Sequence, residues 1–500
     1  MLRRVIKNPF MLLACVLSAG LLDLSFPQLQ WSFLVWIALV PLLCVLDGQK
    51  LWAAFRRAYL CGFLFFAATL GWFVYVTYPG AILLVAFLAL YFGLFGMLFA
   101  YFYAGDGKFR FHSVLRITVL SSVWVALEFI RAHLFSGFGW VMLGHTQYKN
   151  LWLIQIADMT GVYGVSFLVM LVNLLIFETW RARKPLLTVN IFVAAILLIV
   201  LIYGWSTINQ KRSYEMVKVG VVQPNIPLAV DWDESQKPWI VAKTIQLTRT
   251  FQDQKLDLIV WPETSLPGVI TDAPFLTHQI QAAAADLKTS VLIGSVARED
   301  ERYYNSAFLI GADGQMGERY DKIHLVPFGE FLPLRPILGW INKFVDLDDF
   351  TPGKAYKIFS VTPRQRKFGV LICFEDTIGD VRRHFAKAGA EFFVNMTNDA
   401  WFRDTKSPFL HLQAAVFGCV ENHRSLVRAA NTGVSAMVDP WGRVITTVRD
   451  RRGKETFIDG TTWGFVPLNH EKTFYTKYGD LFTYLCFLCI LVAAVFRKYT

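Results

Sequence analysis

Charged side chains are scarce in this chain, and their scarcity limits what the protein can be. Only 17% of the 500 residues are charged, whereas 55% are hydrophobic and 15% are aromatic. Soluble globular domains carry about 25% charged residues. The composition therefore excludes a wholly soluble chain and predicts membrane spans joined to a domain that folds in water.

A basic stripe of the kind that binds nucleic acid is missing as well. The net charge is +11, but the Lys and Arg residues fall in short clusters between apolar runs. Clusters in that arrangement indicate membrane topology. We expect no nucleic-acid partner.

Cysteine and histidine provide neither a disulfide framework nor a metal site. The seven cysteines are an odd number, and Cys486 and Cys489 have CxxC spacing only inside an apolar run. Cys419 lies in an apolar, helix-like segment and is expected to be a buried free thiol. The histidines show no ligand spacing, so we predict no metal and no cofactor.

Eight apolar runs are each near the ~20 residues that a helix needs to cross a membrane. They cover residues 9–26, 31–47, 59–77, 81–104, 115–133, 161–179, 188–207 and 479–496. No small-residue cleavage site stands out near the first run, so we interpret it as an uncleaved span. The sequence predicts eight transmembrane helices.

Lys and Arg residues favour alternate connections between these runs. They occur before run one, after runs two, four and six, and after run eight, whereas the connections after runs one and three contain none. The connection after run five contains only Arg131 and Lys149. Since positive residues favour the cytoplasm, we expect both termini there and residues 211–475 on the outer face.

The sequence pattern changes between the seventh and eighth runs, where short strands alternate with helices. Strands are expected at 217–222, 256–261, 291–296, 306–311, 368–373, 391–396, 426–430 and 434–438, and helices at 235–253, 274–287, 377–388 and 407–424. We therefore predict a membrane domain at 1–210, an α/β domain at 211–475, and an eighth helix with a cytoplasmic tail at 476–500.

The connection at 132–160 is long and mixes aromatic residues with glycines. Two interpretations stay open, because such a segment can line a lipid-facing cleft or serve as an interfacial anchor. Glu128 and Arg131 precede it, three residues apart on one predicted helix. We expect them to form a structural ion pair rather than a headgroup site.

Three polar residues come from separate elements of the predicted α/β domain. Glu263 follows one strand, Cys373 ends another, and Lys322 lies between them in the sequence. Strand ends are where α/β proteins place chemistry. Each residue also has an ordinary interpretation as a surface acid, a surface lysine or a core cysteine.

Together the three residues can perform acyl transfer. A thiol becomes nucleophilic when a base removes its proton, which Glu263 can do if burial raises its pKa. Lys322 can stabilise the oxyanion that forms when Cys373 attacks a carbonyl. The sequence thus predicts Cys373 as nucleophile, Glu263 as base and Lys322 as oxyanion stabiliser.

These motifs resemble the Glu-Lys-Cys triad of the nitrilase, or carbon-nitrogen hydrolase, superfamily. They are Trp-Pro-Glu at 261–263, Lys322 with Pro-Phe-Gly-Glu at 327–330, and Ile-Cys-Phe-Glu at 372–375. With eight predicted spans, nearly the whole chain resembles the bacterial apolipoprotein N-acyltransferase family. Phe374 stands where many relatives have Tyr, and Gly139 where a proline is frequent.

The resemblance implies an extracytoplasmic nitrilase-like domain, an αββα sandwich, facing the periplasm from the bacterial inner membrane. It implies transfer of the sn-1 acyl chain of a phospholipid, typically phosphatidylethanolamine, through a thioester on Cys373. The acceptor would be the α-amino group of the S-diacylglyceryl cysteine that begins a lipoprotein, with ping-pong kinetics.

Further residues are expected to support the triad or to bind substrate. Glu330 would orient Lys322 or the incoming amine, Glu375 would order the loop after the nucleophile, and the Phe374 amide would share the oxyanion. The candidate substrate-binding residues are Trp232, Asn305, Trp340 and Trp401. Trp232 and Trp401 would line an acyl pocket or pack in the core.

The apolar segment 331–344 also has two interpretations, a lid or lipid guide and a buried arm of the core.

Two other functions compete with acyl transfer. A membrane-tethered amidase would pass its thioester to water, and it shares the first half-reaction. A transporter or binding protein with an inactive enzyme domain is disfavoured, because the spans hold almost no central charge and all three triad residues are present.

Overall fold

The computed structural model describes residues 9–103, 113–231, 233–332, 349–361 and 365–499. The chain divides into two compact units. The membrane unit comprises residues 1–211, 405–417 and 478–500, and the α/β unit comprises residues 212–404 and 418–477. Residues 405–417 lie inside the predicted α/β domain in sequence but group with the membrane unit.

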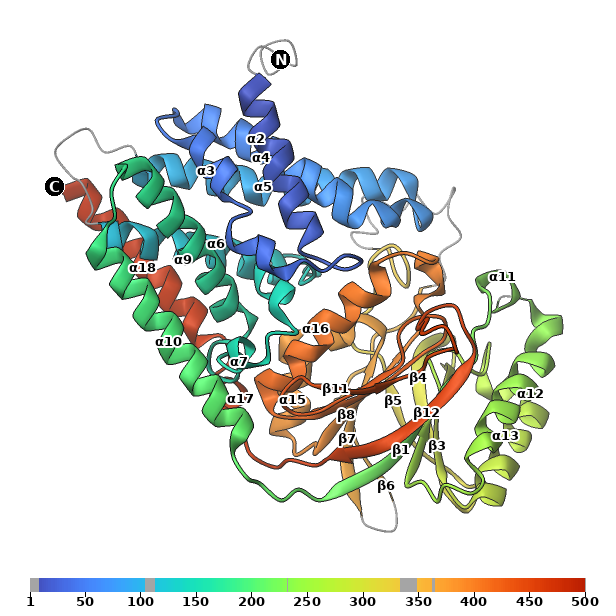
Figure 1. The fold of residues 1–500 in the computed structure, drawn as a ribbon. Coiled ribbons are helices and arrows are strands. Elements are labelled where there is room, and N and C mark those ends of the chain that lie inside the picture. Colours follow the sequence, from blue (N-terminus) through green and yellow to red (C-terminus); the bar gives the residue numbers. More distant parts are fainter. Residues whose placement is uncertain (1–8, 104–112, 232, 333–348, 362–364, 500) are drawn as a thin grey trace. The chain divides into compact units, whose positions relative to one another are not determined.

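The membrane unit consists of helices and short 3-10 turns (Figure 1). Its longer helices are α2 (Pro9–Leu24), α4 (Leu51–Leu70), α5 (Tyr78–Tyr103), α6 (Ser113–His133), α9 (Val162–Ala182), α10 (Leu187–Asn209) and α18 (Leu481–Tyr499). Shorter elements are η1 (Ser32–Trp36), α3 (Val40–Leu46), η2 (Gly71–Tyr75), η3 (Leu143–Gln147), α7 (Leu151–Ile154) and α8 (Ala157–Thr160).

Five of these helical segments are long and apolar enough to cross a membrane: Leu51–Tyr75, Tyr78–Tyr103, Ser113–His133, Val162–Ala182 and Leu187–Asn209. Three shorter apolar segments, Pro9–Leu24, Ser32–Leu46 and Leu481–Arg497, fall on the other predicted runs. The second run is not one continuous helix. It forms two separate elements, η1 and α3. The structure therefore supports a membrane domain with five spanning helices by length and composition.

The third predicted span begins earlier than expected, at Leu51 rather than at residue 59. Arg56 and Arg57 lie inside α4, not in a connection. The Arg57 guanidinium donates to the Val45 carbonyl oxygen at 2.6 Å, and Arg56 Nε donates to the Trp52 carbonyl at 3.3 Å. These backbone acceptors satisfy the guanidinium groups, so the two arginines can lie within an otherwise apolar helix.

Close packing joins α4 to α5. A Cβ atom added to Gly96 would lie 2.6 Å from the Ala54 carbonyl oxygen, so glycine is required at that crossing. Small residues let membrane helices approach in this way.

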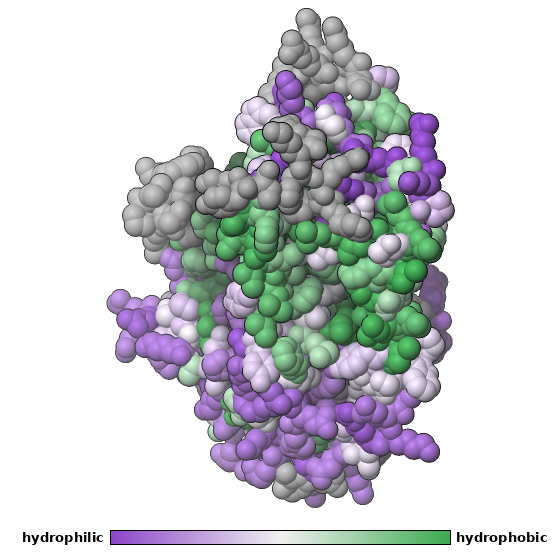
Figure 2. Space-filling model, turned by 90° about the vertical axis from the view of Figure 1, so that its left-hand side faces the viewer, coloured by the Kyte–Doolittle hydropathy of each residue, from purple (hydrophilic) through white to green (hydrophobic). Residues whose placement is uncertain are grey.

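Apolar side chains gather on the face of the unit that Figure 2 shows, where they form the green area. On α10 and α18 the exposed ones include Ile191, Ile199, Ile202, Leu488, Leu491 and Val495. A surface of that kind fits lipid rather than water.

Glu128 and Arg131 are both buried, but the predicted ion pair between them is wrong. No ion pair between the described residues joins Glu128 to Arg131. Glu128 Oε1 accepts from the Leu143 amide at 2.9 Å, and Arg131 Nη2 donates to the Trp140 carbonyl at 2.9 Å. Both charged side chains therefore anchor the connection after α6, whose residues 140–148 are buried.

The α/β unit contains two six-stranded sheets. The first has the order β12-β1-β2-β3-β4-β5 and the second β11-β10-β9-β8-β7-β6. The first comprises β1 (Met216–Gln223), β2 (Leu258–Val260), β3 (Ser290–Glu299), β4 (Arg302–Ile310), β5 (Met316–Asp321) and β12 (Gly460–Pro467). The second comprises β6 (Ile358–Val361), β7 (Arg366–Ile372), β8 (Phe392–Thr397), β9 (Ser425–Ala430), β10 (Ala436–Val438) and β11 (Val444–Thr447).

The two sheets share one pairing scheme. Three central strands run parallel in each, β1-β2-β3 in the first and β7-β8-β9 in the second, and the outer strands pair antiparallel. The turn before β10 contacts the first sheet, since the Ser435 amide donates to the Gln223 side-chain oxygen of β1 at 3.2 Å. The turns that follow β2 and β7 therefore lie at the carboxyl ends of parallel strands, where α/β proteins place their chemistry.

Helices cover the sheets on both sides (Figure 1). α12 (Lys237–Thr248) and α13 (Pro274–Leu287) pack on the first sheet through an apolar core that includes Val241, Ile280 and Ile293. On the second sheet, a Cβ atom at Gly369 of β7 would collide with Phe385 of α15 (Gly379–Lys387), so α15 lies close to that strand. The result is an α/β unit with helix, sheet, sheet and helix layers.

The described residues contain three further α-helices. They are α11 (Leu228–Asp231), α16 (Ser407–Asn422) and α17 (Phe474–Tyr478). The predicted helix at 274–287 matches α13 in both bounds, and Cys419 is buried and forms no disulfide, as predicted.

Four strands were not predicted: β5, β6, β11 and β12. β5 lies at the sheet edge and pairs with β4 alone. Its sequence, Met-Gly-Glu-Arg-Tyr-Asp, lacks the apolar run of a central strand. β12 contains two glycines, and only two of its eight residues are buried. Edge strands of this composition carry little periodic signal.

Candidate active site

Three turns at strand ends carry the predicted triad. Glu263 follows β2, Lys322 directly follows β5, and Cys373 directly follows β7 as the first residue of η8 (Cys373–Thr377). Cys373 has φ of 55°, a left-handed conformation that a non-glycine residue adopts at a cost. The sharp turn brings the Cys373 side chain out of the strand direction, and the residue as a whole is half-buried.

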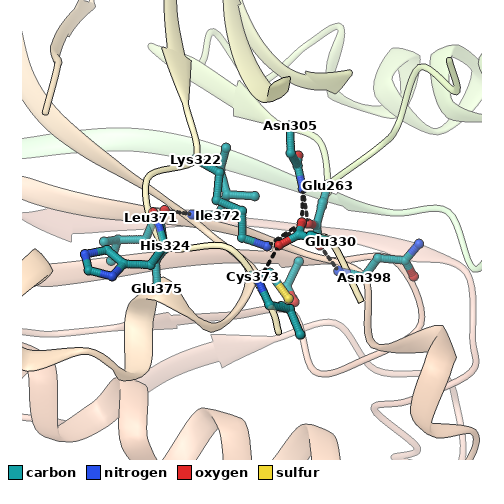
Figure 3. A network of polar contacts seen from close by, with 12 residues as sticks. Glu263, Asn305, Lys322, His324, Glu330, Leu371, Ile372, Cys373, Glu375 and Asn398 are labelled. Carbon is teal, nitrogen blue, oxygen red and sulfur yellow. Dashed lines mark hydrogen bonds and ion pairs between the residues drawn. The ribbon is translucent and has the colours of Figure 1, made fainter. Parts of the chain in front are cut away.

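Lys322 joins two carboxylates. Its ammonium Nζ lies 2.8 Å from Glu330 Oε1 and 3.6 Å from Glu263 Oε1 (Figure 3). The lysine side chain is 1% exposed. A buried ammonium needs such partners, because an isolated charge in the interior is strongly unfavourable.

Asn305 of β4 binds the same two carboxylates. Its side-chain Nδ2 donates to Glu263 Oε1 and to Glu330 Oε1, each at 2.8 Å. Asn305 was predicted to bind substrate, yet its amide donates both bonds to protein carboxylates. Asn305 therefore bridges Glu263 and Glu330 in the structure.

Backbone amides fix the remaining carboxylate oxygens. The Asn398 amide donates to Glu263 Oε2 at 3.0 Å, and the Val326 amide donates to Glu330 Oε2 at 2.8 Å. Each carboxylate is thus held at both of its oxygens, by a side chain at one and by the backbone at the other. The two groups therefore have a defined orientation before any substrate arrives.

Burial and charge shift the pKa values of all three groups. Burial raises the pKa of Glu263, only partly opposed by Lys322. Burial alone would lower the pKa of Lys322, but the neighbouring carboxylate of Glu330 raises it above the ordinary value. Burial and the Glu263 charge hold the pKa of the Cys373 thiol well above its usual range.

Burial thus disfavours the thiolate of Cys373 and increases the proton affinity of Glu263, whereas the Glu330 charge favours the ammonium form of Lys322. A base with a raised pKa can take the thiol proton during attack rather than before it. Figure 3 shows the Cys373 sulfur facing the Glu263, Glu330 and Lys322 side chains. The arrangement is capable of nucleophilic attack on a carbonyl group with stabilisation of the oxyanion.

Glu375 lies two residues beyond the nucleophile and is fully buried. Its carboxylate accepts from the Ile323 amide at 2.9 Å, the Ile372 amide at 2.8 Å and the Tyr320 hydroxyl at 3.0 Å. Burial raises the pKa of Glu375 to about 7 despite these backbone donors. Glu375 thus ties the turn after β5, which carries Lys322, to the turn that carries Cys373.

The other predicted residues differ in where they lie. The Phe374 ring faces the Lys322 ammonium, with Nζ 5.4 Å from the ring centroid. Trp401 lies in η9 (Asp399–Phe402) and is 42% exposed, so it is not a core residue. Trp232 and Trp340, with most of the predicted lid, lie outside the described residues.

Sequence reasoning assigned no role to several buried polar residues behind the site. Asn395 of β8 and Arg428 of β9 are both fully buried. Polar residues in the middle of apolar central strands were the signal that could have identified them. Within the described ranges, no group of three or more His, Cys, Asp or Glu residues could hold a metal ion.

Comparison with known proteins places both units in described families. The family model of the apolipoprotein N-acyltransferase N-terminal domain matches residues 18–175, and that of carbon-nitrogen hydrolase matches residues 218–459. Together with the two sheets, the second match identifies the α/β unit as a nitrilase-like domain.

Curated relatives match over nearly the whole chain. Apolipoprotein N-acyltransferase of Geobacter metallireducens is 37% identical over 97% of this chain and 95% of its own length. The protein of the same name from Allorhizobium ampelinum is 31% identical over 87% of each chain, and that from Chlorobaculum tepidum is 28% identical over 99% of this chain and 98% of its own. This chain belongs to the apolipoprotein N-acyltransferase family.

Proposed function

We propose that this enzyme transfers an acyl chain from a membrane phospholipid to the N-terminal cysteine of a lipoprotein. The acceptor group is the α-amino group of an S-diacylglyceryl cysteine, and the product is an N-acylated lipoprotein. The observation that carries the proposal is the buried set of Glu263, Lys322 and Glu330 beside a strained cysteine turn, in a chain that matches its relatives along its length.

The first half-reaction forms a thioester. Glu263 takes the proton of the Cys373 thiol as the sulfur attacks the sn-1 ester carbonyl of a phospholipid, typically phosphatidylethanolamine. The negative charge that develops on the carbonyl oxygen is stabilised by the Lys322 ammonium and the Phe374 amide. The ester C–O bond then breaks, and the glycerol oxygen leaves with the proton from Glu263 as a lysophospholipid.

The second half-reaction returns the enzyme to its starting state. The acceptor amine attacks the thioester carbonyl, and Glu263 takes a proton from the amine. The C–S bond breaks as the amide forms, and the Cys373 sulfur regains its proton. This sequence requires ping-pong kinetics, since the first product leaves before the second substrate reacts.

The supporting residues act by holding the three reacting groups. Glu330 fixes the Lys322 ammonium at 2.8 Å, and Asn305 bridges the Glu263 and Glu330 carboxylates. Glu375 holds the Lys322 and Cys373 turns together. Trp232, Trp340 and Trp401 would contact acyl chains, a role for which the exposure of Trp401 leaves room.

The membrane domain is proposed to have eight spans, with both termini in the cytoplasm and the nitrilase-like domain facing the periplasm of the inner membrane. The alternation of basic connections supports that orientation. Exposing a lipid chain to water costs about 0.8 kcal/mol per CH₂, so donor and acceptor must reach the site from the bilayer. A hydrolase of small soluble amides would not need such a domain.

The decisive experiment offers the purified enzyme two possible acceptors. Enzyme in phosphatidylethanolamine vesicles is incubated with a peptide that begins with S-diacylglyceryl cysteine, and the peptide mass is measured. Addition of one acyl chain to the peptide amine supports the proposal, and an N-acetylated control peptide should gain none. Release of free fatty acid with no change in either peptide would instead identify a membrane-tethered hydrolase.

A further inference from the structure

One fully buried arginine, Arg428, lies behind the active site in the central strand β9. Its guanidinium donates to the Asn395 side-chain oxygen at 2.6 Å, to Asp376 Oδ2 at 2.7 Å and to Asp399 Oδ2 at 3.2 Å. Nε also donates to the Val434 carbonyl at 3.2 Å. The proposed chemistry makes no direct use of any of these groups.

The first branch of this network ends at the nucleophile. The Asn395 amide, oriented by Arg428, donates to the Cys373 carbonyl at 2.9 Å and to the Leu371 carbonyl at 3.1 Å. Asp376 lies in the same 3-10 turn as Cys373. Arg428 thus holds the 3-10 turn that begins at Cys373 at two points, at the Cys373 carbonyl through Asn395 and at Asp376 directly.

The second branch ends at the base. Asp399 begins the η9 turn, and the residue before it, Asn398, donates its backbone amide to Glu263 Oε2 at 3.0 Å. Asn398 is fixed further by Asn431, whose Nδ2 donates to the Asn398 side-chain oxygen at 3.0 Å. The same guanidinium therefore reaches the loop that orients Glu263.

The network keeps three charged groups in the interior next to the nucleophile. Asp376, Asp399 and Arg428 are each 0% exposed. Asp399 adds to the charges that raise the pKa of the Cys373 thiol. Buried ionic groups can often be replaced by apolar residues of similar volume without loss of stability, so fold stability alone does not require charges at this position.

We propose that Arg428 is a positioning residue that sets the Cys373 turn and the Glu263-holding loop relative to each other. Asn395 transmits its position to the nucleophile, and Asp399 transmits it to the base. The proposal rests on the proposed roles of Cys373 and Glu263. It assigns Arg428 to the geometry of proton transfer from thiol to carboxylate, not to contact with substrate.

The test compares two buried arginines in neighbouring positions of the same fold. Arg428→Lys keeps the charge but loses the forked geometry that joins three partners. Arg424→Lys is the matched control, because Arg424 is 1% exposed and its hydrogen bonds to the described residues all go to backbone carbonyls, including those of Ala390 at 2.6 Å and Glu471 at 2.7 Å. Thermal unfolding of both variants in detergent measures their structural cost.

Two rates separate positioning from stability. One is the pre-steady-state acylation of Cys373 by phosphatidylethanolamine, and the other is the pH dependence of Cys373 alkylation by iodoacetamide, which needs no lipid. We expect Arg428→Lys to slow acylation per folded molecule by about 10²-fold and to shift the alkylation profile. Arg424→Lys should change both by less than about twofold at a similar loss of thermal stability.

A second variant guards against a misfolded protein. Asn395→Asp can still accept from Arg428 but cannot donate to the Cys373 carbonyl, so it should slow acylation while Arg428 stays paired. Equal rates in Arg428→Lys and Arg424→Lys, or wild-type acylation in Asn395→Asp, would overturn the proposal. Failure of the proposed function is separable, since Cys373→Ala would then still transfer acyl chains.

Discussion

One buried ion pair of the membrane unit and two buried clusters of the α/β unit arrange charge differently. In the membrane unit, Arg116 of α6 and Glu178 of α9 form a bidentate pair with N–O distances of 2.6 and 2.5 Å. That pair is neutral and joins two helices. In the α/β unit, Lys322 pairs with two carboxylates, those of Glu263 and Glu330. Arg428 also pairs with two, those of Asp376 and Asp399.

We interpret the difference as one between charge that holds a fold and charge that performs chemistry. A balanced buried pair can be replaced by apolar residues at little cost, because desolvation consumes most of its attraction. A cluster with several carboxylates raises the proton affinity of the groups around it, as the Glu330 charge does at Glu263 and Cys373. Both clusters of the α/β unit adjoin the proposed nucleophile.

The largest expected effect comes from removing the cation of the proposed catalytic cluster. Lys322→Gln leaves Glu263 and Glu330 facing each other and removes the oxyanion stabiliser, so kcat for acyl transfer should fall by on the order of 10³. Acyl transfer to the diacylglyceryl peptide is the measurement. Lys237→Gln is the control, because Lys237 pairs with the largely exposed Glu234 at 2.5 Å, and its rate should stay within about twofold.

The next effect concerns the neutral pair of the membrane unit. Arg116→Leu should destabilise the protein by about 3 kcal/mol because it leaves the Glu178 carboxylate buried without its cation. The double variant Arg116→Leu with Glu178→Leu should recover most of that loss in detergent thermal unfolding. The comparison breaks down if the double variant is no more stable than the single one, or if Lys322→Leu with Glu330→Leu recovers activity.

Acid should inhibit acylation through Glu263. The base form is the carboxylate, and its pKa is raised by burial, so the rate is full above that pKa and falls about tenfold per pH unit below it. The hydrogen bond from Asn305 lowers the same pKa. Asn305→Ala should therefore move the acid limb of the rate profile to higher pH, which pre-steady-state acylation between pH 5 and 9 measures.

A profile unchanged in Asn305→Ala would mean that another group sets the acid limb. An acid limb that moved to lower pH would contradict the assignment of Glu263 as the base.

The smallest effect is the contribution of Glu375 to pH-dependent stability. Its pKa is about 7 in the folded protein against an ordinary value of 4.5 for an unfolded chain, so the folded state binds the proton more tightly. The resulting stability is full below 4.5 and is lost as pH rises through about 7. Glu375→Gln should flatten the slope of thermal midpoint against pH in that window, and an unaltered slope would assign it to other groups.

Much of the proposed site could be anticipated from the sequence because each triad residue adjoins a recognisable motif. Cys373 and Glu263 follow short apolar runs that form central strands β7 and β2, where the pattern is strongest. Lys322 was found by its motif alone, since the strand before it, β5, is a polar edge strand that the pattern did not reveal.

The partners of these residues could not be anticipated in the same way. Asn305 contacts Glu263 across 42 positions of sequence, and Arg428 contacts Asp376 across 52. Such contacts depend on which strand ends the topology brings together. A shift of one residue in the pairing of two strands would replace these contacts by others. The predicted ion pair between Glu128 and Arg131 was wrong for a related reason. Each side chain instead forms a hydrogen bond with the backbone of the buried connection after α6.

The most direct measurement is the intact mass of the enzyme after incubation with phosphatidylethanolamine that carries one defined sn-1 chain, with no acceptor present. The wild type should gain the mass of one acyl group, and hydroxylamine should remove it as expected for a thioester. Cys373→Ala should gain nothing. An unmodified wild-type protein, or an acyl adduct that persists in Cys373→Ala, would contradict a thioester on Cys373 as the centre of the reaction.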